Sequence, residues 1–266
     1  MSETSRRRDE ALLTRVKLGS IHCTPITWSK TLAEVLRLVV DDRPHLVVTV
    51  NIAHVWQARA EPDLRAAYSR STVATADGWP VVAAIRLLGR NRHRVERVTG
   101  ADLVPALGRE SLRIAVVGGK GESAQLAAAT LASAGRATIA LVEQAPREEL
   151  DDLDARRRLV DRICSSDADV VLIGLGVPRQ EALALELMDV LPRGVVACVG
   201  AAIEFTAGTD RRAPRWMRRV GLEWLHRVIR EPRKLAARYL RSAPYFLVVV
   251  AREFFASRAG LERRRG

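Results

Sequence analysis

Six short runs of apolar, β-branched residues, separated by stretches with helical periodicity, constrain the fold of this chain more than any other feature. Most of these runs are apolar throughout, which is typical of strands that are covered on both faces. Strands that alternate with helices form βαβ units and a mostly parallel sheet. We therefore expect an α/β, Rossmann-like sheet flanked by helices. The predicted strands are 46–50, 72–76, 113–117, 138–142, 170–173 and 195–199. The predicted helices between them lie near 53–67, 80–88, 122–134, 154–165 and 180–190.

The composition agrees with a folded enzyme-sized domain and excludes several other classes. The chain has 266 residues, of which 48% are hydrophobic, so it can bury a substantial core. Its three cysteines are far apart and form no CxxC pair, which argues against a disulfide scaffold or a cysteine zinc site. No apolar run reaches the roughly 18 residues that a membrane-spanning helix needs. The polar N-terminal segment lacks the apolar core of a secretory signal, so we expect a cytoplasmic protein.

The positive charge of the chain is concentrated at its C-terminal end. Residues 211–266 carry 16 basic and 4 acidic side chains, which accounts for the whole net charge of +12. We therefore predict a neutral α/β catalytic domain over 1–210 and a basic helical appendage over 211–266, divided into helices at Pro232 and Pro244. A basic helix with tryptophan on its apolar face suits an anionic membrane surface. The alternative, in which these aromatic residues pack on the α/β core, stays open.

Polar residues and glycines follow several of the predicted strands. Thr49 and Asn51 end the first strand, Asp77-Gly78 follows the second, and Gln180 follows a Gly/Pro loop after the fifth. Because ligands of open α/β sheets bind at the carboxyl ends of the strands, these residues are candidates for a site. Asp77 is also compatible with an ordinary Asp-Gly turn, and Gln180-Glu181 with an ordinary helix start.

Other classes of site have weak support in the sequence. The glycine-rich loop at 118–121 fits neither the GxGxxG dinucleotide fingerprint nor the Walker A pattern, which argues against a nicotinamide oxidoreductase. The five histidines form no metal-binding pattern, and Asp152 and Asp154 lie in an acidic helical stretch that we interpret as solvated surface. A basic nucleic-acid-binding or nucleotide-binding Rossmann-like protein without transferase activity is an open alternative, although that reading leaves the polar strand ends unexplained.

Three motifs, in order, resemble the signatures of the WecG/TagA/CpsF glycosyltransferases (glycosyltransferase family 26). The first is TVNIAHVWQARAEPDLRAAYSRSTVATADGWPVVAAIRLLG followed by RVTGADLVPAL, the second is GLGVPRQE, and the third is VGAAIEFTAGTDRRAPRWMRRVGLEWLHRVIREPRKLAARYL. Together they cover residues from about 46 to 241. The sequence departs from the family pattern at Ile203, Trp79-Pro80 and Ala237.

The resemblance implies an inverting, metal-independent transferase without a cofactor. Such an enzyme moves a sugar, of the N-acetylmannosamine type or glucose, from a UDP-sugar to an undecaprenyl-diphosphate-linked saccharide. The implied setting is cell-wall, cell-surface or exopolysaccharide biosynthesis, with the enzyme peripheral on the inner face of the cytoplasmic membrane. The resemblance implies no nucleic-acid partner and is compatible with a homo-oligomer.

The resemblance also assigns roles to residues of this chain. Asp77 of ADG matches the proposed general base, and Thr49 and Asn51 of TVN match a polar pair on the acceptor side of the pocket. Gln180 of PRQE matches a glutamine at the mouth of the active site. The remaining residues match groups near the donor or in the basic appendage over the site. They are Arg97, Asp102, Arg227, Lys234 and Arg238.

Overall fold

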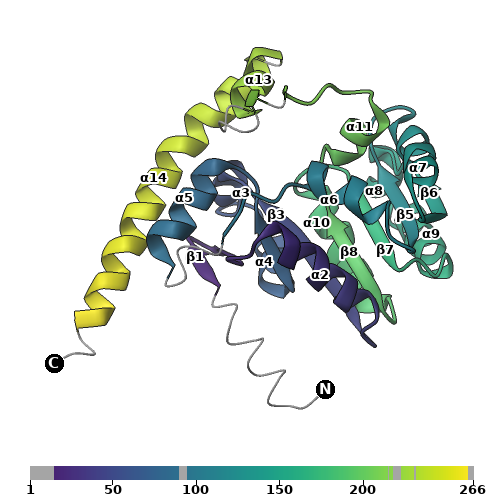
Figure 1. Cartoon of the computed structure of the whole chain (residues 1–266), viewed down its shortest axis with the longest axis horizontal. Coiled ribbons are helices and arrows are strands. Elements are labelled where there is room, and N and C mark those ends of the chain that lie inside the picture. The colour runs from purple at the N-terminus through teal and green to yellow at the C-terminus, as the bar shows by residue number, and fades with distance from the viewer. Residues whose placement is uncertain (1–14, 90–94, 215, 218–222, 231, 263–266) are drawn as a thin grey trace.

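A six-stranded parallel sheet forms the centre of the molecule (Figure 1). The computed structural model describes residues 15–89, 95–214, 216–217, 223–230 and 232–262. The strands occur in the order β4-β3-β8-β7-β5-β6. Their bounds are β3 Pro44–Val50, β4 Val73–Ala76, β5 Arg113–Gly118, β6 Thr138–Glu143, β7 Val170–Gly174 and β8 Gly194–Cys198. All six predicted strands are confirmed, as is the α/β, Rossmann-like class.

Helices cover both faces of this sheet, because the central strands present apolar side chains on both faces. In β3, Leu46, Val48 and Val50 join one buried cluster, whereas Val47 joins the other. The first face carries α3 Ile52–Gln57, α4 Pro62–Arg70, α5 Trp79–Leu88, α8 Arg147–Asp151, α9 Leu153–Ser165 and α10 Arg179–Val190. The second face carries α2 Trp28–Val39, α6 Gly100–Leu107, α7 Ser123–Ala134 and α11 Ala202–Ala207.

A short antiparallel hairpin precedes the sheet and was not expected from the sequence. Its strands are β1 Val16–Leu18 and β2 Ile21–Cys23, of three residues each. Gly19 has a φ of +67° at the first of the two turn residues, a conformation that favours glycine. Strands this short carry too little periodicity to be recognised, so only the buried side chains of Leu18 and Ile21 reveal their packing on the first face.

The basic C-terminal segment forms helices, as predicted, but they are divided differently. Helix α13 spans Glu223–Arg230 and α14 spans Pro232–Glu262, so the expected break at Pro232 is confirmed. The expected break at Pro244 is wrong, because Pro244 lies inside α14. A proline inside a helix costs about 3 kcal/mol, and burial of Phe246 and Val249 in the core on the following turn offsets this cost.

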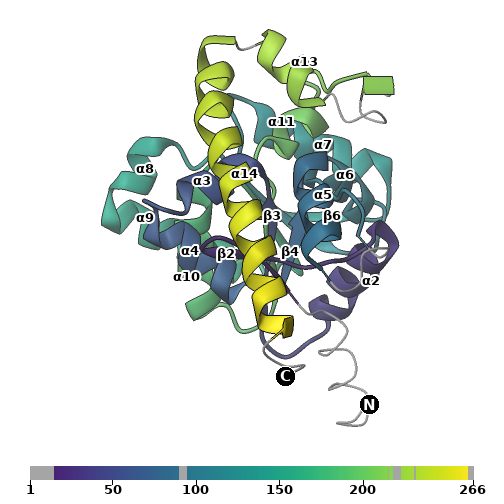
Figure 2. The same ribbon diagram turned by 90° about the vertical axis from the view of Figure 1, so that its left-hand side faces the viewer.

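Helix α14 contributes side chains to the core of the α/β domain. It packs on α3, α5 and β1 and runs along this side of the molecule in both views (Figures 1 and 2). The inward side chains Phe246 and Val249 are only 4% and 5% exposed. The outward side chains Leu240, Leu247 and Phe255 are 67–75% exposed. The division into domains at residue 210 therefore stays a prediction, since the core of the first part includes side chains of the second.

The chain leaves two neighbouring strands in opposite directions. Strand β3 leads into α3 on the first face, whereas the adjacent β8 leads into α11 on the second. Such a switch point opens a crevice at the carboxyl ends of the strands, which is where open α/β sheets bind their ligands. The residues after β3, β4, β7 and β8 are therefore the first place to look for a site.

The packing of α14 makes a testable prediction for stability. Phe246→Ala removes a buried ring and should lower the free energy of unfolding by about 3–5 kcal/mol. Leu247→Ala, one residue further along the same helix and 69% exposed, should change it by less than about 0.5 kcal/mol. Chemical denaturation of both variants measures the difference. Equal effects would show that α14 does not pack on the body through Phe246.

Candidate active site

Asp77 and Asn51 lie side by side at the carboxyl edge of the sheet. The parallel register pairs Val50 with Ala76, and the backbone N–H of Asp77 donates to the carbonyl of Val50 at 2.8 Å. The residues that follow each strand are thereby neighbours. Asp77 is partly exposed at this edge. Gly78, with φ +119°, turns the chain into α5 directly after it.

Asn51 is held rigidly because both ends of its amide are engaged. Its Oδ1 accepts from the backbone N–H groups of Ala53 and His54 at 3.0 and 3.1 Å and so caps the N-terminus of α3. Its Nδ2 lies 3.2 Å from Nε2 of His54. The ring of His54 is buried, and Nδ1 lies 2.8 Å from the carbonyl of Thr49. The Asn51 side chain is therefore both a helix cap and a fixed part of the site.

His54 acts as a neutral structural ring beneath Asn51. Burial lowers its pKa to about 4, and the positive charge of Arg238 contributes in the same direction. The hydroxyl of the fully buried Tyr68 donates to the carbonyl of Thr49 at 2.5 Å and lies 2.7 Å from Nδ1 of His54. Burial and the charges of Glu181 and Asp77 raise the pKa of Tyr68. The last two residues of β3 thus rest on a buried polar network that stays uncharged at neutral pH.

Gln180 connects the loop after β7 to the loop after β8. Its side chain is 3% exposed, its Oε1 accepts from the backbone N–H of Gly200 at 3.2 Å, and its Nε2 donates to Oε1 of Glu181 at 2.8 Å. Glu181 is fully buried, and no described residue bonds to its Oε2. Burial raises the pKa of Glu181 to about 7. The sequence predicted the start of α10 here, and α10 does begin at Arg179, but the burial of the Glu181 carboxyl was not foreseen.

Arg97 reaches this edge along the outer side of β4. The backbone N–H of Val98 donates to the carbonyl of Ala76 at 2.9 Å, which places Arg97 close to Asp77. The Arg97 guanidinium lies 3.4 Å from Asp102 and 3.1 Å from Glu223 of α13. In the described structure this arginine is therefore paired with two carboxylates.

Arg212 completes the same ionic cluster and joins the C-terminal segment to α6. Its guanidinium lies 2.7 Å from Asp102 and 3.0 Å from Glu223, and it also donates to Thr99 at 3.2 Å. Burial alone would raise the pKa of Asp102, but the hydrogen bond and charge of Arg212, together with Thr99 and Arg97, lower it. Asp102 and Arg97 thus serve as the anchor of the segment that leads to α13. Neither Arg212 nor Glu223 was singled out from the sequence, because their partners near α6 lie more than 100 residues earlier in the chain.

The remaining predicted site residues come from α13 and α14. Arg238 lies in α14, and its charge acts on the buried His54, which places it near the end of β3. Arg227 lies in α13 and Lys234 in α14, but their side chains are outside the described residues. Arg238 is therefore the one predicted appendage residue whose side chain the described structure connects to the site.

The glycine loop after β5 approaches the loop after β7 closely. Gly119 donates its backbone N–H to the carbonyl of Gly174 at 2.9 Å, and a Cβ on Gly118 would lie 2.7 Å from the same oxygen. Gly118 and Gly119 also have φ of +100° and +88°. Both positions therefore need glycine for geometry alone. Whether the loop also contacts an anion stays a prediction.

The described residues contain no cluster of three or more histidine, cysteine or acidic side chains placed to hold a metal. The Asp152 carboxylate accepts from the backbone N–H of Ala155 at 2.7 Å and caps α9. Asp154 is exposed and lies 3.6 Å from Arg157. The interpretation of this acidic stretch as surface is confirmed. The absence of a metal requirement stays a prediction.

The chain is a doubly wound α/β protein with polar side chains at a switch point, the place where such sheets bind their ligands. The model of the WecG/TagA/CpsF glycosyltransferase family matches residues 16–260. The chain belongs to this family, and it is a glycosyltransferase of cell-surface polysaccharide biosynthesis. The family implies a sugar-nucleotide donor and a lipid-linked acceptor. No helix in the described part of the chain is both long and apolar enough to cross a membrane.

Glu181 makes a prediction for the pH dependence of stability. Its pKa is about 7 in the folded protein, against 4.5 for the ordinary carboxyl, so the folded state binds the extra proton between these values. The unfolding free energy of the wild type should therefore fall, relative to Glu181→Gln, as the pH rises from about 4.5 to about 7, by up to about 3 kcal/mol. Urea denaturation of both proteins across this range measures the difference. A difference that is constant with pH would mean that folding does not raise the pKa of Glu181.

Proposed function

We propose that this chain is an inverting glycosyltransferase that moves a sugar from a UDP-sugar to an undecaprenyl-diphosphate-linked saccharide, with Asp77 as the general base. The observation that carries the proposal is the position of Asp77. Asp77 is partly exposed and follows β4 beside Asn51 at the carboxyl edge, in the same region as Thr49 and Gln180. A sugar donor of the N-acetylmannosamine type or glucose is the expectation that the family resemblance supports.

In the proposed reaction the acceptor oxygen attacks C1 of the donor sugar. The acceptor O–H bond breaks and its proton passes to the Asp77 carboxylate. The bond between C1 and the diphosphate oxygen breaks, and its electron pair leaves with UDP. A single displacement of this kind inverts the anomeric centre. A positioned base contributes about 10²–10⁴-fold to such a step. The partly exposed Asp77 carboxylate is suited to this role because it is not buried in packing.

The departing UDP needs positive charge at the same edge. Arg97 lies beside the end of β4 and now pairs with Asp102 and Glu223. We assign it to the donor diphosphate, for which one carboxylate of the cluster has to give way to phosphate oxygens. Carboxylate and phosphate groups both present anionic oxygens, and a guanidinium group can form bidentate contacts with either. In this proposal cationic side chains balance the leaving group without a divalent ion.

The lipid-linked acceptor requires that the enzyme reach a membrane surface. The outward face of α14 offers Leu240, Leu247, Val248 and Phe255, all between 64% and 75% exposed. Basic residues of the same segment surround them, which suits the boundary between headgroups and acyl chains. We propose peripheral attachment to the inner face of the cytoplasmic membrane through this face. The oligomeric state and the lack of a nucleic-acid partner stay predictions.

Asp77→Asn should lower kcat by about 10²–10⁴-fold, because the amide cannot accept the acceptor proton. The measurement is sugar transfer from UDP-sugars to a polyprenyl-diphosphate-linked saccharide, with products identified by mass. This screen also identifies the donor sugar. Asp63→Asn is the matched control, because Asp63 is an exposed acid in the first turn of α4. The control should keep its activity, and both variants should keep the wild-type unfolding midpoint. Turnover by Asp77→Asn near that of the control would remove Asp77 from the role of base.

Membrane attachment through α14 is tested best by point substitutions. Deleting residues 211–266 would also remove Phe246 and Val249 from the core, so the truncated protein would report on folding as well as on binding. Leu247→Glu should lower affinity for anionic vesicles by about tenfold or more, because it removes apolar contact and adds a repelled charge. Val190→Glu is the control, since Val190 is an exposed apolar residue at the end of α10. Equal binding by the two variants would place the membrane contact elsewhere.

A further inference from the structure

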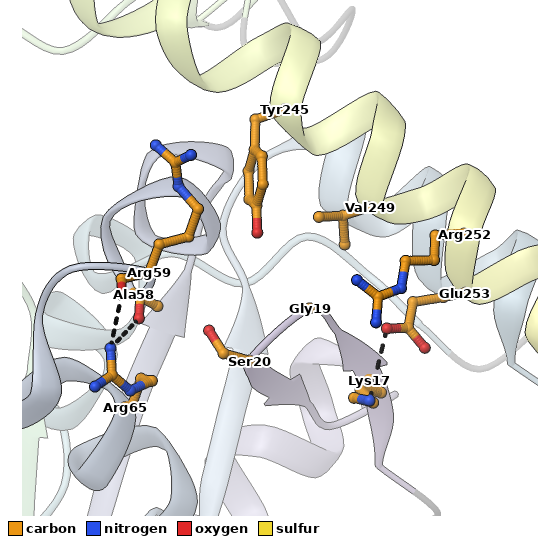
Figure 3. A pocket seen from close by; sticks show the side chains of 10 residues that line it. All are labelled: Lys17, Gly19, Ser20, Ala58, Arg59, Arg65, Tyr245, Val249, Arg252 and Glu253. Carbon is orange, nitrogen blue, oxygen red and sulfur yellow. Dashed lines mark hydrogen bonds and ion pairs between the residues drawn. The ribbon is translucent and has the colours of Figure 1, made fainter.

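A cavity lies between α14 and the β1–β2 hairpin, and Asp77 does not line it. This open cavity has a volume of about 430 Å³ and is bordered by the hairpin turn, the end of α3, the start of α4 and one side of α14 (Figure 3). Tyr245, Val249 and Arg252 extend from α14 toward the turn formed by Gly19 and Ser20. We call this cavity the α14 pocket. None of the site residues predicted from the sequence lines it.

The α14 pocket is strongly basic. Its charged lining residues are Lys17, Arg59, Arg65, Arg252 and Glu253. The one carboxylate, Glu253, lies 3.8 Å from the ammonium group of Lys17 and so balances a single charge. No described residue forms an ion pair with Arg59, Arg65 or Arg252. Three arginines without an ion pair among the described residues therefore border one concavity, with their guanidinium groups on different sides of it (Figure 3), and a bound anion would reduce their mutual repulsion.

Two of these arginines are held in place by contacts that use only some of their N–H donors. The Nη1 of Arg65 donates to the carbonyls of Ala58 and Arg59 at 2.7 and 3.1 Å, at the end of α3. The guanidinium of Arg59 lies 4.5 Å from the ring centre of Tyr245, and its Nε donates to the carbonyl of Trp56. Since a guanidinium carries five N–H donors, each keeps further donors for a ligand. Contacts within the protein thus orient Arg59 and Arg65, while Arg59 and Arg252 are exposed to solvent.

The lining of the pocket suits a phosphate group. Guanidinium groups form paired, charge-assisted hydrogen bonds to phosphate oxygens, and several of them together match a group with three or four such oxygens. In the adjacent strand β2, burial and the charges of Arg15 and Lys17 lower the pKa of His22, whereas Glu253 raises it. The exposed Val248 and Phe255 lie on the same turns of α14 as the pocket residues Val249 and Arg252. An apolar surface beside a basic pocket is the arrangement that a phospholipid fits.

We propose that the α14 pocket is a binding site for a phosphate group, carried by the headgroup of an anionic lipid. The apolar outward face of α14 would contact the acyl region while Arg59, Arg65 and Arg252 bind the phosphate. This site is separate from the Asp77 edge, and it does not depend on the transferase reaction. It is tested by binding, so a failure of the proposed catalytic role of Asp77 leaves it unaffected.

The experiment compares Arg59→Gln, Arg252→Gln and Ser20→Asp with Arg241→Gln in the full-length protein. Ser20 is exposed in the hairpin turn, so a carboxylate there opposes an anion in the pocket. Arg241 is an exposed α14 residue that does not line the pocket, and its substitution removes the same charge from the same helix. One arm titrates glycerol 1-phosphate by calorimetry. The other measures co-sedimentation with phosphatidylcholine vesicles with and without phosphatidylglycerol. The unfolding midpoint of each variant confirms that it is folded.

Each pocket variant should weaken glycerol phosphate binding by about tenfold. Each should also weaken phosphatidylglycerol-dependent sedimentation by more than the roughly fivefold that loss of any one surface charge produces. Arg241→Gln should leave glycerol phosphate binding unchanged. The pocket variants could weaken glycerol phosphate binding while leaving vesicle binding equal to that of Arg241→Gln. That result would keep the phosphate site but overturn an anionic lipid as its ligand. Equal effects of all four substitutions in both arms would overturn the site itself.

Discussion

The pairing of β3 with β4 is the interaction on which the rest of the site depends. It places Val50 opposite Ala76, so the first residues beyond the two strands, Asn51 and Asp77, become neighbours. A shift by one residue would turn every side chain of a strand to the opposite face. Because both faces of these strands are apolar, alternation alone does not prevent such a shift. The helix starts at Asn51 and Gly78 fix it, since each strand must end where its helix begins.

Buried polar groups below the site hold the ends of these strands rigidly in place. The carbonyl of Thr49 is contacted by Tyr68 and His54, and Asn51 is bonded to the helix that it caps. Desolvation keeps the histidine and the tyrosine neutral, so the network adds no fixed charge beneath Asp77. The buried layer beneath Asp77 is therefore neutral. Positive charge arrives from outside the sheet, through Arg97 along β4 and Arg238 from α14.

The sequence predicts the parts of this molecule that depend on local patterns. The six strands are apolar and β-branched, and the polar residues that follow them are visible as breaks in that pattern. The hairpin at 16–23 escaped because three-residue strands have no period, and α2 and α6 were also not predicted. The burial of Glu181 escaped for a different reason, because a glutamate in a first helical turn is typical of an exposed cap. The cluster of Arg97, Asp102, Arg212 and Glu223 depends on contacts across more than 100 residues, which no local pattern encodes.

Helix α14 connects features that the sequence presents as separate. Its inward face completes the core through Phe246 and Val249, and its outward face presents Leu240, Leu247 and Phe255. Along its axis, Arg238 and Arg252 are separated by about 20 Å, at 1.5 Å of rise per residue. One residue acts on His54 at the site, and the other lines the α14 pocket. A helix lying flat on a membrane would hold both arginines at a similar depth. The same packing that makes α14 part of the body would thus set the distance between the lipid surface and the carboxyl edge of the sheet.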